Sequence, residues 1–130
     1  MNREIKFKAW DSSNKNWLTD KDNVFINEEG VCFILVRGAA SDYLSTVDVG
    51  ICLYTGLKDK NGKEIYEGDL CNLIPFEDNK NNEHMIGVRQ VIWENTHACF
   101  YFSGWVPLHW GVFESIEIIG NIYENPELVK

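Results

Sequence analysis

The side chains that could carry chemistry in this chain are its three histidines and four cysteines, and one short segment brings both types together. His97 and Cys99 lie two positions apart, so in a strand their side chains point to the same face. Both types ligate zinc, but a zinc site needs four ligands, or three and a water molecule. Other donors, such as His84, His109 and Cys71, show no ligand spacing. We therefore expect no metal site, with His97 in a turn and Cys99 in the core.

Nucleophilic catalysis and cofactor binding have no better support in the sequence. A catalytic Ser or Cys needs a base that orients it, and no Gly-x-Ser-x-Gly or Ser-x-x-Lys motif occurs. A phosphate-binding loop and a dinucleotide fingerprint are also absent. The acidic pairs Glu77–Asp78 and Glu114/Glu117 are interpreted as solvated faces, because sequence proximity does not place two carboxylates across a cleft. We expect a protein that is not an enzyme and takes no cofactor.

Aromatic side chains are concentrated in one segment, residues 100–113, which holds six of them. Successive aromatics at 100–102 must point to both faces of a strand. Trp105 and Trp110 flank Pro107, beside glycines that break regular pairing. Interface cores favour such side chains, so the segment predicts an interaction surface made of Tyr101, Trp105, Trp110 and Phe113. The alternative is that these residues form core and a lid over the end of a barrel.

A second candidate is the turn-rich segment YTGLKDKNGKEIYEGD at 54–69. Asn61-Gly62 is a turn pair, and Gly68-Asp69 is a second turn. Exposed loops on rigid barrels often carry binding, so one interpretation is a recognition loop made of Lys58, Asp59, Lys60, Asn61 and Lys63. The other interpretation is that both turns are folding devices that set strand register while Leu57, Ile65 and Tyr66 pack inward.

Short strands must position these residues, because no segment keeps a 3.6-residue apolar period over three turns. The strands come at 8–12-residue spacing, which is typical of an all-β barrel or sandwich. The expected strands are residues 5–9, with Ile5, Phe7 and Ala9 buried, and 24–26, 31–36, 51–54, 70–74, 88–93, 98–102 and 115–123. Gly120 is expected at a bulge or close approach. Asn125 is expected to cap a terminal helical turn that opens with Pro126, and polar residues 77–84 to form a mobile surface loop.

Length and charge narrow the class of protein further. The 130 residues predict one domain. The net charge is −8, with nine basic and 12 acidic side chains in residues 1–69 but three and eight in residues 70–130. Without a basic stripe, binding to nucleic acid or to an anionic membrane is disfavoured. No apolar run approaches the roughly 20 residues of a membrane span. The cysteines show no CxxC pair and are read as free thiols of a reducing cytoplasm.

Three pieces of the sequence together resemble the YopX-like family of small phage and prophage proteins. They are IKFKAWD at 5–11, YTGLKDKNGKEIYEGD at 54–69 and IIGNIYENPEL at 118–128. The resemblance implies an SH3-like barrel over about residues 51–124, a β extension over about residues 1–50, and expression in the cytoplasm of a bacterial host. It implies no activity and brings no catalytic residues.

The expected fold is therefore an all-β, SH3-like barrel with an N-terminal β-strand extension. The expected function is that of a non-catalytic interaction or self-assembly module. Its protein partner is unknown, and a homo-oligomer is expected. The alternative is a nucleic-acid-associated factor, since aromatic side chains on small barrels stack on bases, or an acidic decoy of a host DNA-binding protein. The negative charge opposes direct binding to nucleic acid.

Overall fold

A computed structural model describes residues 5–18, 24–29, 31–36, 43–46, 49–76 and 85–129 of the chain. Within these ranges the regular structure consists of β-strands and short 3-10 turns, which confirms the predicted all-β class. The chain divides into two compact units. One is Phe7–Cys52, and the larger one combines Met1–Lys6 with Leu53–Lys130. The polar segment 77–84, expected to be a surface loop, lies outside the described residues.

The smaller unit contains two sets of paired strands. β1 (Phe7–Asp11) pairs antiparallel with β2 (Asn16–Trp17), and Trp10 lies opposite Trp17 with ring centroids 5.1 Å apart. β3 (Val24–Ile26), β4 (Cys32–Val36) and β5 (Tyr43–Thr46) form an antiparallel three-stranded sheet. The hairpin expected around residues 27–30 is thereby confirmed, with Ile26 opposite Cys32. β6 (Val49–Lys58) begins in this unit and continues into the larger one.

The larger unit is built on a meander of strands closed by the last strand. After β7 (Glu64–Tyr66), the chain forms β8 (Asp69–Pro75), β9 (Gly87–Glu94), β10 (Cys99–Phe102) and the short β11 (Val106–Pro107). A 3-10 turn, η4 (Trp110–Val112), leads into β12 (Phe113–Asn121), and η5 (Pro126–Leu128) follows. The five-stranded order is β11-β10-β9-β8-β12, so β12 returns beside the first strand of the meander.

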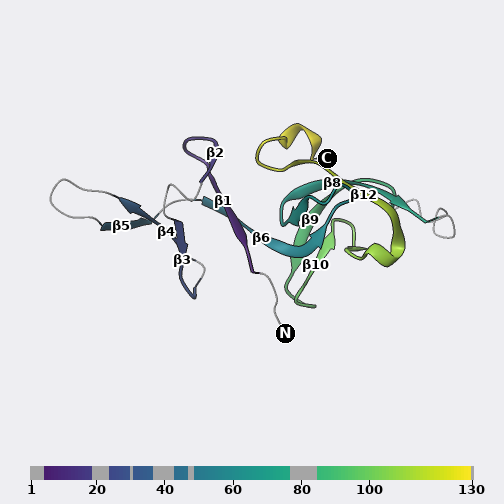
Figure 1. Cartoon of the computed structure of the whole chain (residues 1–130), viewed down its shortest axis with the longest axis horizontal. Coiled ribbons are helices and arrows are strands. Elements are labelled where there is room, and N and C mark those ends of the chain that lie inside the picture. Colours follow the sequence, from purple (N-terminus) through teal and green to yellow (C-terminus); the bar gives the residue numbers. More distant parts are fainter. Residues whose placement is uncertain are drawn as a thin grey trace. The chain divides into compact units, whose positions relative to one another are not determined.

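This order, with a 3-10 turn before the returning strand, is that of an SH3-like barrel, as the sequence predicted. Figure 1 shows β8, β9, β10 and β12 curving together as one bent sheet. Pro107 lies on β11, the edge of this sheet, where a residue without a backbone N–H is tolerated. The predicted bulge at Gly120 is confirmed by a register shift between Ile118 and Gly120.

The core of the larger unit lies inside the bend of this sheet. It is formed by buried apolar side chains from β7 to β12, which are Ile65, Cys71, Leu73, Met85, Val91, Phe102, Val106, Phe113 and Ile116. Phe102 and Phe113 meet edge to face, with ring centroids 5.9 Å apart. Leu57, Ile65 and Tyr66 pack inward or against this core, as expected.

Two local expectations are wrong. Ile5 and Phe7 do not share a buried face with Ala9: Ile5 precedes β1 and is 82% exposed, and Phe7 is 37% exposed. Buried residues come instead in succession, at Ala9, Trp10 and Asp11, so the strand does not keep a simple alternation. The Asn125 side chain does not cap η5; its Oδ1 accepts from the Asn121 backbone N–H at 3.2 Å.

Candidate functional site

The turn at 59–63, part of the predicted recognition loop, is organised around Asp59. Asp59 Oδ1 accepts from the backbone N–H groups of Asn61 and Lys63, both at 2.9 Å. Its Oδ2 accepts from the Ile118 N–H at 3.0 Å. Desolvation would raise the pKa of Asp59, but these three hydrogen bonds outweigh it and lower the pKa below its ordinary value. Asp59 is buried and both of its carboxylate oxygens are bonded within the fold, so it is not the exposed loop residue that the sequence indicated.

The other members of the predicted recognition loop lie at the surface, against β12. Lys58, Lys60, Asn61 and Lys63 are all exposed. The Lys60 backbone N–H donates to the Ile116 carbonyl at 2.9 Å, and its ammonium group lies 3.3 Å from a Glu117 carboxylate oxygen. Gly62 has a φ of +80°, as the turn requires. The folding-device interpretation thus accounts for the turn geometry.

The structure distributes the four residues of the predicted interaction surface over three places. Phe113 lies in the core and is 1% exposed, so its assignment to a surface is wrong. Trp110 is half-buried against the core, and its indole Nε1 donates to the Lys58 carbonyl at 2.8 Å. Tyr101 and Trp105 stay together, with ring centroids 5.7 Å apart. Successive residues of β10 point to opposite faces, which separates Tyr101 from Phe100 and Phe102.

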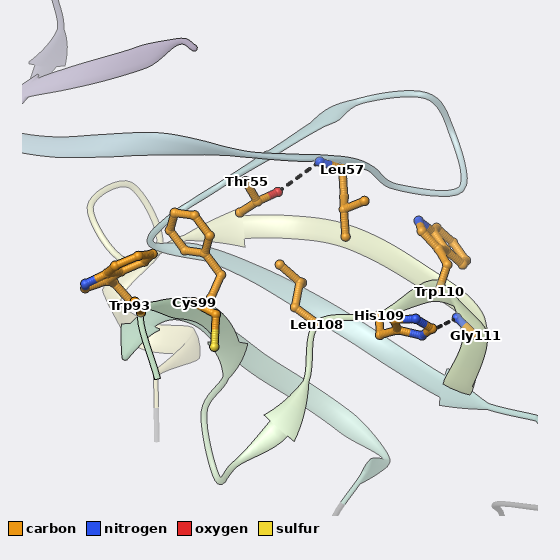
Figure 2. Close-up of a pocket in the computed structure, with 10 residues that line it drawn as sticks. Thr55, Leu57, Trp93, Cys99, Leu108, His109, Trp110 and Gly111 are labelled. Atoms are coloured by element: carbon orange, nitrogen blue, oxygen red, sulfur yellow. Dashed lines mark hydrogen bonds between the residues drawn. The ribbon is translucent and has the colours of Figure 1, made fainter. Parts of the chain in front are cut away.

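A groove of about 600 Å³ lies between β6, the β9–β10 hairpin and η4. Figure 2 shows Leu57 and Leu108 pointing into its middle, with Trp93 at one end and Trp110 at the other. Trp93 and Phe100 are direct cross-strand partners, and their rings meet edge to face with centroids 5.0 Å apart. The groove is thus an apolar trough with an indole at each end.

Several polar atoms that line this groove are bonded within the fold. Thr55 Oγ1 donates to the Ile65 carbonyl at 2.8 Å and accepts from the Leu57 N–H at 3.2 Å. His109 Nδ1 accepts from the Gly111 N–H at 2.9 Å. In Figure 2 the Cys99 sulfur points away from the His109 ring, which lies near the other end of the groove. The two residues are therefore not arranged as nucleophile and base, whose side chains must be in hydrogen-bond reach.

The residues considered for zinc are also placed apart. His97 lies in the β9–β10 turn, as expected, and is exposed; its Nδ1 lies 2.7 Å from Glu94 Oε2. Cys99 is half-buried at the strand rather than within the core. Cys71 is fully buried, and His84 lies outside the described residues. Among the residues that the structure describes, no group of three or more His, Cys, Asp or Glu side chains could hold a metal ion.

A second aromatic cluster lies on the opposite face of β10 from Phe100. His97, Tyr101 and Trp105 have pairwise ring-centroid distances of 6.3, 6.1 and 5.7 Å, at interplanar angles of 79°, 87° and 65°. We call this cluster the aromatic corner. Trp105 is 65% exposed and has a φ of +63°, in the left-handed region that bulky residues rarely adopt.

Comparison with known proteins identifies the family. The chain matches the YopX family, described as YopX protein, over residues 6–130, and it belongs to this family. No curated protein matches it. Its structure is similar to the crystal structure of protein EF1440 from Enterococcus faecalis, with a TM-score of 0.59 and 24% identity over 99% of this chain and 100% of that one.

A second similar structure is the X-ray structure of protein yopX from Bacillus subtilis. The TM-score is 0.53 and the identity 18%, over 99% of this chain and 100% of that chain. At these identities the likeness shows the fold alone. In the described ranges, no helix is long and apolar enough to cross a membrane.

The groove was not predicted from the sequence, since its lining comes from four separate parts of the chain. One signal could have found part of it. Once the hairpin around residues 94–98 is accepted, Trp93 and Phe100 must face each other, and that pair forms one wall of the groove.

Proposed function

We propose that the chain is a non-catalytic protein-interaction module of phage or prophage origin, acting in the cytoplasm of a bacterial host. Its groove binds an extended apolar segment of a partner protein. The observation that carries this proposal is the trough between Trp93 and Trp110, with Leu57 and Leu108 between them. Grooves lined by aromatic side chains are the sites where small barrels take extended and proline-rich segments.

The state of the polar groups favours binding over catalysis. Thr55, His109 and Trp110 each use a polar atom to hold a local turn or strand. A catalytic centre needs a nucleophile or a general base whose reactive atom is aimed at the substrate. An occupant of an apolar trough gains binding free energy from the apolar surface that it buries, at roughly 25 cal/mol per Å².

An extended backbone fits this arrangement better than a compact ligand. The indoles stand at opposite ends of the trough, so one occupant must be elongated to reach both. Proline suits such a site because its ring packs flat on an indole and its fixed φ reduces the entropy lost on binding. We therefore propose a segment with two apolar or proline residues spaced to meet Trp93 and Trp110.

Self-association and nucleic-acid binding are the competing functions. A second copy would bring another charge of −8, which opposes close approach at low salt. Nucleic acid would need phosphate-neutralising side chains, and residues 90–129 contain neither Lys nor Arg. Both alternatives are measured directly in the experiment below.

The test is selection of a random displayed-peptide library on the full chain, followed by NMR mapping of the selected peptides. We expect peptides with spaced proline or apolar residues, and shifts centred on the Trp93, Trp110 and Leu108 signals. Trp93→Ala should weaken binding about tenfold, which is the effect of losing roughly 1.4 kcal/mol of contact. Ile119→Ser is the matched control, since Ile119 is exposed on β12 and does not line the groove.

Three outcomes would overturn the proposal. Selected peptides that bind Trp93→Ala and the parent equally would place the site elsewhere. A salt-sensitive shift of random duplex DNA would favour the nucleic-acid alternative. A stable dimer in light scattering whose NMR contacts map to the groove would mean that the groove is closed by a second copy.

A further inference from the structure

The aromatic corner is a second candidate site, next to the groove: its rings lie on the face of β10 opposite Phe100, while Ala98 of the same β9–β10 turn lines the groove. His97 comes from the turn between β9 and β10, Tyr101 from β10 itself, and Trp105 from the turn between β10 and β11. The three rings meet at steep angles, so none of them stacks flat on another. At these centroid distances, a single point can lie ~4 Å from all three ring centroids, which is within the range of a cation–π contact.

The backbone that presents Trp105 is strained. Trp105 and the preceding Gly104 both have positive φ, and a bulky side chain in this conformation costs of order 1–3 kcal/mol. Burial does not offset this cost, because Trp105 is 65% exposed. A strained, exposed indole that contacts two further rings points to a use outside the fold.

The electrostatics of the aromatic corner favour a positively charged ligand. Glu94 lies beside it, in contact with His97. Desolvation would raise the pKa of Glu94, but the N–H groups of Thr96 and His97 and the His97 ring lower it to about 2, so it stays ionised. Those same hydrogen bonds occupy both carboxylate oxygens. Glu94 therefore supplies negative charge from a carboxylate that is already held by hydrogen bonds within the turn.

Two of the chain's described cations are engaged with rings elsewhere. Cation–π contacts join Lys6 to Tyr54 and Lys8 to Trp17, and residues 90–129 contain no Lys or Arg. Ordinary ammonium groups hold their water strongly and seek hydrogen-bond acceptors. A quaternary ammonium group carries a diffuse charge under apolar methyl groups and needs no acceptor, which makes it the cation that ring faces recognise best.

We propose that the aromatic corner of His97, Tyr101 and Trp105, with the charge of Glu94 beside it, binds a quaternary ammonium group. The ligand inserts its methyl groups against the ring faces. This site is independent of the peptide groove, and either one can exist without the other.

The test is a titration of the full chain with choline, followed by tryptophan fluorescence and by NMR shifts of the aromatic signals. The matched neutral probe is 3,3-dimethylbutan-1-ol, which has the shape of choline without its charge. We expect saturable binding of choline, with shifts confined to the aromatic corner, and at least about tenfold weaker binding of the neutral alcohol, as expected when cation–π attraction dominates.

Two variants separate this site from the groove. Trp105→Leu keeps an apolar side chain but removes the π face, and should weaken choline binding about tenfold. Trp93→Ala, which impairs the groove, should leave choline binding unchanged. Equal binding of choline and the neutral alcohol, equal binding by Trp105→Leu and the parent, or no saturation would each overturn the proposal.

The source of the group is resolved by two further ligands. A peptide with trimethyllysine and a phosphocholine vesicle carry the same cation on a protein and on a lipid surface. Tighter binding of the peptide than of free choline identifies a modified protein as the source, and tighter binding of the vesicle identifies a lipid head group. If both bind more weakly than an unmodified lysine peptide, the quaternary assignment is wrong.

Discussion

Asp59 and Ile118 are joined by a hydrogen bond of 3.0 Å between Asp59 Oδ2 and the Ile118 backbone N–H. The bond links the stretches 54–69 and 118–128, two of the three that resemble the YopX family. The other Asp59 oxygen holds the turn formed by Asn61 and Lys63. One carboxylate thus closes a turn and fixes that turn onto β12.

Asp59→Asn should lower the free energy of unfolding by about 2 kcal/mol, because an amide replaces a charged acceptor of three backbone N–H groups. Urea denaturation of the two proteins measures this loss. The control is Glu114→Gln, which removes a carboxylate exposed on β12 and should change stability by less than about 0.5 kcal/mol. An Asp59→Asn protein as stable as the parent would contradict the assignment.

The same carboxylate predicts a pH dependence. Its pKa in the folded chain is lowered from the ordinary value of 3.8. Its contribution is therefore present above that value and is lost as pH falls through the lower, folded-state pKa. Asp59→Asn should lose less stability than the parent over this acid range. Parallel stability curves would show that the Asp59 pKa is not shifted.

Gly62→Val should destabilise the chain by about 1 kcal/mol or more, because Gly62 has a φ of +80° that a β-branched residue adopts only with strain. A Cβ at this position would meet nothing within 4 Å, so the cost comes from the backbone alone. Gly62→Asn should recover most of it, since Asn tolerates this conformation. Thermal unfolding of the three proteins checks the order.

Trp105→Gly should be more stable than Trp105→Ala by about 1 kcal/mol. Both variants remove the indole and its ring contacts, so their difference isolates the strain of the positive φ. Chemical denaturation gives the two values. Equal stabilities would mean that the turn relaxes when the indole is removed, and that it is not strained by its own sequence.

Trp105→Glu and Trp110→Glu should behave differently. Trp105 is the more exposed, and its replacement should leave the circular dichroism and thermal midpoint close to the parent's. Trp110 packs on the core and donates to Lys58, so a buried charge there should unfold or strongly destabilise the chain. Light scattering of Trp105→Glu beside the parent then reports whether this face holds an oligomer together.

The cysteines should differ in reactivity. Cys52 and Cys71 are buried and Cys99 is half-buried, and burial raises the pKa of Cys71 well above its ordinary value. An alkylating reagent should therefore modify half-buried Cys99 first and reach Cys52 and Cys71 only on unfolding. Mass spectrometry of the digested protein measures the order. Equal thermal midpoints with and without reductant are the companion expectation, and a large drop on reduction would contradict it.

Most of the strands were predictable because they depend on local signals, whereas the pairing of β12 with β8 joins segments far apart in the chain. Alternation and turn residues mark most strands, and the Asn61-Gly62 and Gly68-Asp69 turns fix where they reverse. The bulge at Gly120 was predictable in the same way, but the close contact of Gly120 with Asn125 was not. A Cβ at position 120 would lie 2.5 Å from Asn125 Oδ1. Sequence alone could not reveal that contact, which also explains why Asn125 does not cap η5.

The candidate sites were less predictable because burial is a tertiary property. Their residue types suggest a surface position for Asp59 and an interface position for Phe113. In the structure, Asp59 is hydrogen-bonded to Ile118 of β12, and Phe113 packs against Phe102. Tyr101 and Trp105 were correctly placed together. Their grouping with Trp110 was wrong because the pleat of β10 and the position of η4 place the two tryptophans on different faces.

The return of β12 to β8 has a consequence for synthesis of the chain on the ribosome. β8 through β11 are made first, and until residues 113–121 emerge, one edge of β8 lacks its strand partner. That edge carries apolar residues such as Leu70 and Leu73, and open edges of this kind recruit strands from other chains. Pro75 discourages pairing only at the last residue of β8. The nascent protein is therefore most prone to aggregation in the interval before its last strand is synthesised, and chaperones that cover strand edges would act then.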